Sequence, residues 1–125
     1  MSLHAIRSNT LAPPVGPFSQ AIHAGDFIFL SGQVGLTAEG KLVDGGIEAQ
    51  AKQIFSNLAA VLDAAGKSFA DVVRVGVFLT DIGDFAALNA IYATHFDEPY
   101  PARTTVGVAA LPLGAVVEID MVVKA

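Results

Sequence analysis

Cysteine and tryptophan are absent from this chain of 125 residues, and charged residues make up only 15% of it. Without cysteine, the chain can form no disulfide, no thiolate nucleophile and no cysteine-ligated zinc site. The low charge is unusual, because soluble globular proteins carry about 25% Asp, Glu, Lys and Arg. Since 53% of the residues are hydrophobic, we expect either an unusually apolar surface or one that is partly covered by other subunits.

The sequence also lacks the marks of membrane, secreted and nucleic-acid-binding proteins. Its longest apolar run, from Val106 to Val117, contains Pro112 and is too short to span a bilayer. Residues Met1 to Arg7 have no apolar segment of a secretory signal, so we expect a cytoplasmic protein. Seven Lys and Arg against twelve Asp and Glu give a formal net charge of -5, which argues against a nucleic-acid partner.

Hydrophobic periodicity predicts two helices. From Ile47 to Ala65, apolar residues recur at steps of three and four, and Gly66 follows as a helix stop. A second helix is expected to begin at Asp84 as its N-cap and to continue to His95 or Phe96.

Short apolar or alternating segments predict five strands. Two of them flank the turn Ala24-Gly25-Asp26 and should pair antiparallel. The predicted strands are Ser19–Ala24, Phe27–Gln33, Asp71–Thr80, Arg103–Val108 and Val117–Lys124. The order β-β-α-β-α-β-β indicates an α+β fold, in which two helices pack on one face of a mixed sheet. With no linker or repeat, residues 1–125 are expected to form one domain.

Judged by residue type and spacing alone, few residues suit catalysis. His4, His23 and His95 are far apart and have no ligand spacing, so we expect no metal site. The serines lack the G-x-S-x-G context of a hydrolase nucleophile.

Arg103 and Glu118 are the exceptions, because each is a charged residue among apolar neighbours in a predicted strand. Arg103 could form a structural salt bridge to Glu118 or Asp120, on what we take to be the adjacent strand. Alternatively, its planar guanidinium could bind a small carboxylic acid through two hydrogen bonds. Glu118 could have a raised pKa suited to moving protons.

Several motifs together resemble one family. They are Gly16-Pro17-Phe18-Ser19-Gln20-Ala21, Ser31-Gly32-Gln33, Asp84-Phe85 with Asn89, Pro101-Ala102-Arg103-Thr104, and Val117-Glu118-Ile119. In this order and spacing, from about Arg7 to Lys124, the chain resembles the Rid family, also called YjgF. The segment Pro-Ala-Arg-Thr, with Glu-Ile about fifteen residues later, is the specific part of the resemblance.

The resemblance implies a chorismate-mutase-like fold that assembles as a homotrimer with a central barrel and ligand clefts between subunits. It implies hydrolysis of reactive 2-imino and enamine acids, such as 2-iminobutanoate and 2-iminopropanoate, to 2-keto acids and ammonia. This reaction protects pyridoxal-phosphate enzymes and needs no cofactor. The implied partners are therefore a small imino or keto acid and further copies of the chain.

The resemblance also assigns roles to individual residues. Arg103 would bind the substrate carboxylate, and Glu118 would deprotonate the hydrolytic water. The backbone of Thr105 would line the cleft. Ser31 and Gly32 would form its wall near the imine nitrogen, although they could simply end a strand. Two further positions complete the set: Asn89 would supply a cleft amide, unless it is a solvated helix residue, and Phe18 stands where many relatives have Tyr, so a hydroxyl is missing.

Two other functions remain open at this level. One is a non-catalytic trimer that binds small carboxylic acids or partner proteins. The other is endoribonuclease activity, which is attached to some relatives. The acidic balance of this chain, with its scattered Lys and Arg, disfavours binding to RNA.

Overall fold

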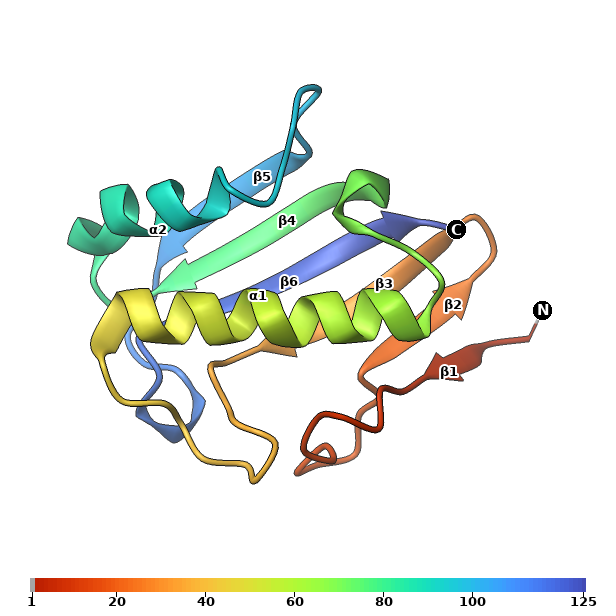
Figure 1. Ribbon diagram of the computed structural model, residues 1–125, viewed down its shortest axis with the longest axis horizontal. Helices are drawn as coiled ribbons and strands as arrows, with labels where there is room; N and C mark the ends of the chain where they lie inside the picture. The colour runs from red at the N-terminus through yellow and green to blue at the C-terminus, as the bar shows by residue number, and fades with distance from the viewer. Residues whose placement is uncertain (1) are drawn as a thin grey trace.

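One mixed sheet of six strands, covered on one face by two helices, makes up the fold (Figure 1). The computed structural model describes residues 2–125. In chain order the elements are β1 (His4–Ile6), β2 (Ala21–Ala24), β3 (Phe27–Gln33), α1 (Gly46–Ala64), β4 (Val72–Leu79), α2 (Phe85–Tyr92), β5 (Ala102–Gly107) and β6 (Val117–Lys124). The predicted α+β class is confirmed. The edge strand β1, which pairs antiparallel with β2, was not predicted.

The strand order in the sheet is β1-β2-β3-β6-β4-β5. The last strand, β6, lies between β3 and β4 and is antiparallel to both, whereas β4 and β5 are parallel. The strands that carry Arg103 and Glu118 are therefore not adjacent, and our expectation that they are neighbours was wrong. The sequence at β5 and β6 does not reveal that the earlier strand β4 separates them.

The two helix predictions differ in accuracy. Helix α1 lies within one residue of its predicted limits at both ends, and Gly66, at φ 71°, ends it. The Gly66 N–H donates to the Asp63 carbonyl and the Lys67 N–H to the Leu62 carbonyl, the pair of bonds that closes a Schellman motif. Helix α2 ends at Tyr92, earlier than predicted. The apolar spacing continues past it because His95 and Phe96 still pack on Phe55.

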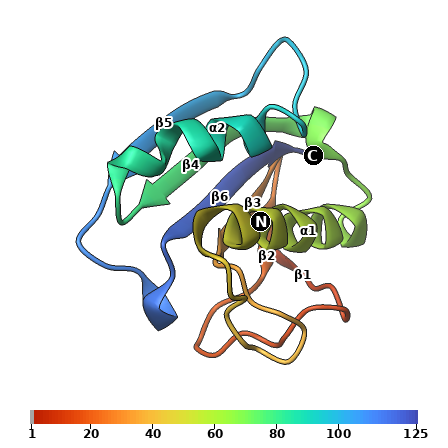
Figure 2. The ribbon, with the colours of Figure 1, turned by 60° about the vertical axis from the view of Figure 1, so that its left-hand side comes forward.

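Alternation along the strands divides the sheet into two unlike faces. Val75, Val77 and Leu79 of β4, with the odd-numbered residues of β6, are buried beneath the helices. Figure 2 shows α1 and α2 on this same side of the sheet. We call the other side the open face. Its exposed apolar side chains include Phe27 (43%) and Phe29 (49%) of β3 and Val106 (39%) of β5.

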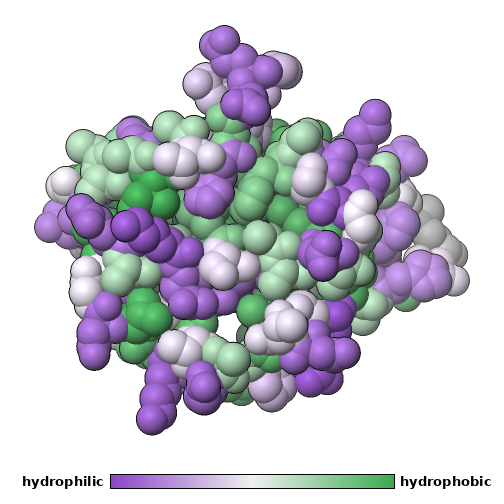
Figure 3. Space-filling view, in the orientation of Figure 1, coloured by the Kyte–Doolittle hydropathy of each residue, from purple (hydrophilic) through white to green (hydrophobic). Residues whose placement is uncertain are grey.

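The helix-covered face is mixed in character. Hydrophilic and hydrophobic side chains alternate over it in small patches, and hydrophilic ones gather on the loop that projects before β5 (Figure 3). No helix within residues 2–125 combines the length and hydropathy needed to cross a bilayer.

Candidate functional site

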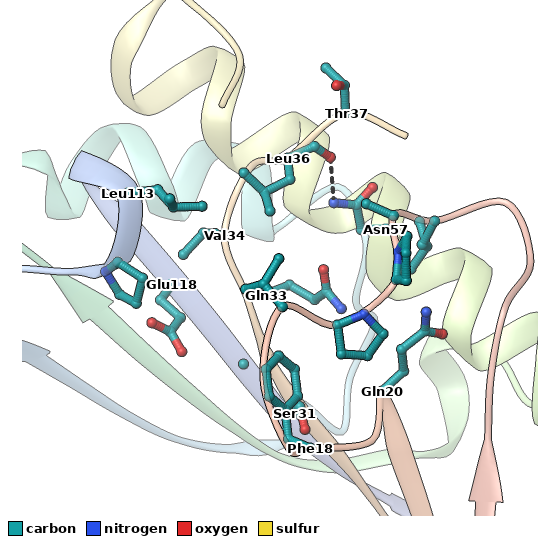
Figure 4. A pocket seen from close by; sticks show the side chains of 17 residues that line it. Phe18, Gln20, Ser31, Gln33, Val34, Leu36, Thr37, Asn57, Leu113 and Glu118 are labelled. Carbon is teal, nitrogen blue, oxygen red and sulfur yellow. Dashed lines mark hydrogen bonds between the residues drawn. The ribbon is translucent and has the colours of Figure 1, made fainter. Parts of the chain in front are cut away.

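A cavity of about 480 Å³ opens beside β3 and β6 (Figure 4). Four of the predicted site residues line it: Phe18, Ser31, Gly32 and Glu118. Most of the remaining wall is apolar and comes from Leu11 to Val15, Val34, Leu36, Pro112 and Leu113. Glu118 is therefore the carboxylate of a largely apolar cavity.

Gly32 and Glu118 are brought together by an irregularity in the sheet. Between the pairs Leu30–Met121 and Gln33–Ile119, two residues of β3 face one residue of β6, which is a β-bulge. Bulges often re-aim side chains next to active sites. A methyl group at Gly32 would overlap the Glu118 carboxyl group, so glycine here leaves room for the carboxylate to lie against the backbone of β3.

Ser31 fixes the loop that carries Phe18. Its hydroxyl donates to the Ser19 carbonyl at 2.6 Å, and its N–H donates to the Gln20 carbonyl at 3.0 Å. Phe18, at the tip of that loop, is 51% exposed, and its ring lines the cavity. Ser31 therefore lines the cavity and braces the Phe18 loop from within β3, which continues to Gln33 instead of ending at Ser31.

Glu118 belongs to the open face, half-buried between the buried residues Val117 and Ile119. Burial raises the pKa of its carboxyl group, and the negative charge of Asp120 on the same face raises it further. A carboxylate with a raised pKa is a stronger base than an ordinary glutamate, as proton transfer near neutral pH requires.

The other predicted residues, Arg103, Thr105 and Asn89, lie elsewhere, at β5 and α2. The Arg103 guanidinium carbon lies 4.6 Å from the ring centroid of Tyr92 and 5.4 Å from that of Phe85. Both distances are within cation–π range. Within residues 2–125 the guanidinium lies over aromatic rings instead of beside a carboxylate. The salt bridge to Glu118 or Asp120 is thus wrong, because β4 stands between the strands.

The elements that carry and face this arginine also hold buried polar atoms without partners. Within residues 2–125, three buried side-chain oxygen atoms have no hydrogen-bond partner, namely Asn89 Oδ1, Tyr92 OH and Thr105 Oγ1. All three come from α2 and β5, the elements that hold Arg103. Each such atom costs about 1–3 kcal/mol of stability. Buried oxygen atoms without partners are expected where a polar ligand binds. The buried Oδ1 also shows that Asn89 is not a fully solvated helix residue.

Arg103 and Glu118 are separated within one chain. In the ladder Arg103 is level with Val75 and Glu118 with Phe78 of the intervening strand β4. This places them about 10 Å apart across the sheet and about 10 Å along it. Arg103 is also on the helix-covered face, like Val75, whereas Glu118 is on the open face. One chain therefore holds two half-sites: the glutamate half-site (Phe18, Ser31, Gly32, Glu118) and the arginine half-site (Asn89, Tyr92, Arg103, Thr105).

Tyr92 and Phe85 are the residues that sequence reasoning missed. Their helical spacing predicts core positions, and nothing in the pattern distinguishes a ring that packs on leucine from one that packs on arginine. The available signal was that Phe85, Asn89 and Tyr92 share one helix face at i, i+4 and i+7. As for metals, residues 2–125 bring together no group of three or more His, Asp or Glu side chains suited to an ion.

Comparison with known proteins identifies the family of this chain. A family described as Endoribonuclease L-PSP matches residues 9–125. A 2-iminobutanoate/2-iminopropanoate deaminase from Dermatophagoides farinae is 45% identical over 125 residues, which cover 98% of each chain. The chain belongs to the Rid (YjgF, L-PSP) family.

Solved Rid structures share the whole fold. RidA from an Antarctic Psychrobacter is 44% identical, with a TM-score of 0.92 over 98% of this chain and 99% of that one. Escherichia coli TdcF, solved with bound serine, is 32% identical with a TM-score of 0.90, over 98% of both chains. In this Rid protein, the motifs that carried the resemblance contain every residue of the two half-sites except Tyr92 and Thr105.

Proposed function

We propose that this chain hydrolyses 2-imino acids, such as 2-iminobutanoate and 2-iminopropanoate, to 2-keto acids and ammonia. The observation that carries the proposal is the pair of complementary half-sites: a free guanidinium that suits a carboxylate, and a carboxylate with a raised pKa that suits a water molecule. The deaminase relative at 45% identity supports the same reaction. The hydrolysis would remove reactive imines and enamines that can damage pyridoxal-phosphate enzymes.

The arginine half-site binds the substrate. The planar guanidinium of Arg103 donates two hydrogen bonds to the carboxylate of the imino acid. Asn89 and Thr105 contribute polar atoms that have no hydrogen-bond partner within residues 2–125. The carboxylate is adjacent to the imine carbon, so binding it also fixes the position of the reacting carbon.

The glutamate half-site activates water. Glu118 accepts a proton from water as the water oxygen bonds to the imine carbon. It returns that proton to the nitrogen, which gives a carbinolamine. Glu118 then takes the proton of the new hydroxyl group and passes it to the nitrogen as the carbon–nitrogen bond breaks, so that ammonia and the 2-keto acid leave. Ser31 and Gly32 form the wall near that nitrogen, and the Phe18 ring covers the ligand without the hydroxyl that a tyrosine would add.

The two halves meet between copies of the chain. Because Arg103 and Glu118 lie on opposite faces, a complete site takes each from a different subunit. The apolar residues of the open face, among them Phe27, Phe29 and Val106, would be covered by the same contact. We therefore propose a homotrimer in which the three sheets form a central barrel. Such an assembly also accounts for the low charge of the sequence.

The test uses imine generated in situ by an amino-acid oxidase or dehydratase. The unmodified chain should accelerate release of ammonia, and Arg103→Ala and Glu118→Gln should each lower kcat/KM by at least about 100-fold. Asp26→Asn, an exposed carboxylate in the β2–β3 turn, is the control and should match the unmodified protein. Full activity in folded Arg103→Ala would overturn the assignment.

A second candidate is a trimer that binds small carboxylic acids without catalysis. It is favoured by the arginine half-site, which is complete without Glu118, and by a relative that was solved with serine bound. Binding of 2-oxobutanoate with no acceleration of imine decay would support it. RNA cleavage is not proposed, because the chain carries a net charge of -5.

A further inference from the structure

Helix α2 presents one face to β5. Phe85, Asn89 and Tyr92 follow one another at i, i+4 and i+7, which aligns them along a single helix stripe. The rings at the two ends of this stripe both lie within 5.4 Å of the Arg103 guanidinium carbon. The stripe therefore faces a cation instead of an apolar strand surface.

Tyr92 differs from the other rings nearby. It is 8% exposed, and its ring also packs against Phe55 and Phe96, with centroids 6.1 and 4.5 Å away. The aromatic cluster holds the ring, and the guanidinium carbon of Arg103 lies over that ring at 4.6 Å from its centroid. Phe69, in the same cluster, contacts Phe55, His95 and Phe96 but neither Tyr92 nor Arg103. Tyr92 thus connects the aromatic cluster of the core to the long side chain of Arg103.

An aromatic ring is better suited than a carboxylate to hold a guanidinium that must also bind an anion. A cation–π contact attracts the guanidinium from one face and leaves the N–H groups at its edge unoccupied. A salt bridge would instead consume those N–H groups and neutralise the charge. The guanidinium is held in place and can still bind an anion.

We propose that Tyr92 is the positioning residue of Arg103: its ring, fixed by the aromatic cluster, holds the guanidinium in the orientation that binds the substrate carboxylate. This inference rests on the proposed function only for the identity of the ligand, a 2-oxo or 2-imino carboxylate. The contact that matters is that of the ring. The hydroxyl makes no hydrogen bond of good geometry within residues 2–125. Burial raises its pKa, while the charge of Arg103 and a hydrogen bond with it lower the pKa, so the hydroxyl is close to the guanidinium and adds to the contact of the ring.

The experiment compares four proteins: the unmodified chain, Tyr92→Leu, Tyr92→Phe and Phe69→Leu. For each, calorimetry gives the affinity for 2-oxobutanoate and for its uncharged analogue 2-oxobutanamide. The ratio of the two affinities measures how well the arginine recognises a carboxylate, and a general loss of packing does not alter it. Imine hydrolysis is measured on the same samples.

Tyr92→Leu should lower the carboxylate preference about tenfold, the size of a partly desolvated cation–π contact, and raise KM by a similar factor with little change in kcat. Tyr92→Phe, which keeps the ring, should stay within about threefold of the unmodified protein. Phe69→Leu should keep the full preference even if it lowers the melting temperature. An equal preference in Tyr92→Leu and Phe69→Leu overturns the role of Tyr92.

The two proposals can fail separately. Active imine hydrolysis combined with an unaltered preference in Tyr92→Leu rejects the positioning role and keeps the deaminase. If the unmodified protein hydrolyses no imine but Tyr92→Leu removes its preference for the carboxylate, the deaminase is rejected and the positioning role is kept. An unmodified protein that does not distinguish the acid from the amide rejects carboxylate binding by Arg103 and, with it, the positioning role of Tyr92.

Discussion

Arg103 and Glu118 project from opposite faces of one sheet, with β4 between their strands. Every other residue of either half-site lies on the same side as its own charged member or in the adjoining loops. A chain folded this way cannot bring both charges to one small ligand. Whether the two charges act on one ligand therefore depends on how copies of the chain assemble, and an experiment that mixes two variants tests this.

Two inactive variants should restore activity when combined. Arg103→Ala retains the glutamate half-site and Glu118→Gln retains the arginine half-site. If the proposed trimers form at random from equal amounts of the two variants, one chain's Glu118 meets its neighbour's Arg103 in about a quarter of the sites. We expect about a quarter of the unmodified specific activity after the two are unfolded and refolded together. Mixed trimers that stay inactive, with mixing verified by native mass spectrometry, would show that both charges act within one chain.

Gly32→Ala should damage catalysis through Glu118. The new methyl group meets the Glu118 carboxyl group, which must rotate away from the β3 backbone. We expect kcat to fall by at least about tenfold, since displacement of a catalytic group by about 1 Å is costly. Gly107→Ala is the matched control, because a methyl group there lies 3.8 Å from the nearest side-chain atom, in Ile82. Equal kcat values for the two variants would contradict the packing argument.

Activity should fall in acid as Glu118 takes up a proton. Burial and the charge of Asp120 raise its pKa, so the carboxylate is protonated at a higher pH than an ordinary glutamate. The protonated form cannot accept a proton from water, and kcat/KM should therefore decrease as the pH falls through this raised pKa. A pH–rate profile measures it. An acid limb at or below the ordinary glutamate value would remove Glu118 as the base.

Asp120→Asn should move that acid limb to lower pH. Asp120 lies on the open face over Gly76, and its own pKa is raised by burial while a hydrogen bond from the Gly76 backbone and the charge of Arg74 lower it. Removing its negative charge makes ionisation of Glu118 easier, so the pKa of Glu118 decreases. The same profile in Asp26→Asn, which removes a charge at the distant β2–β3 turn, should coincide with that of the unmodified protein.

The sequence predicted local structure better than pairing. Gly66 and the spacing from Ile47 to Ala65 located α1 within one residue because local geometry determines a helix and its cap. Strand β1 has only three residues, too few to show alternation, and its pairing with β2 is a distant contact. The insertion of β6 between β3 and β4 likewise depends on packing of the whole chain.

The site was predicted in its parts but not in its arrangement. Arg103 and Glu118 stood out in the sequence because charged residues are rarely buried among apolar neighbours unless they are paired. Tyr92 was not, since an aromatic residue at helical spacing is expected in any core. The helix stripe that faces Arg103 became meaningful only when the parallel pairing of β4 and β5 placed α2 over that strand.

The aromatic setting of Arg103 has a consequence for how an anion reaches it. The rings leave the guanidinium charge uncompensated, but the chain as a whole carries a net charge of -5. At low ionic strength, where the Debye length is about 30 Å at 0.01 M, the molecule therefore repels an anionic ligand that approaches from a distance. Moderate salt screens this long-range repulsion more than it weakens the short-range attraction between the guanidinium and the anion. The rate of ligand association should therefore rise with salt, whereas it falls with salt in an enzyme whose charges attract its substrate.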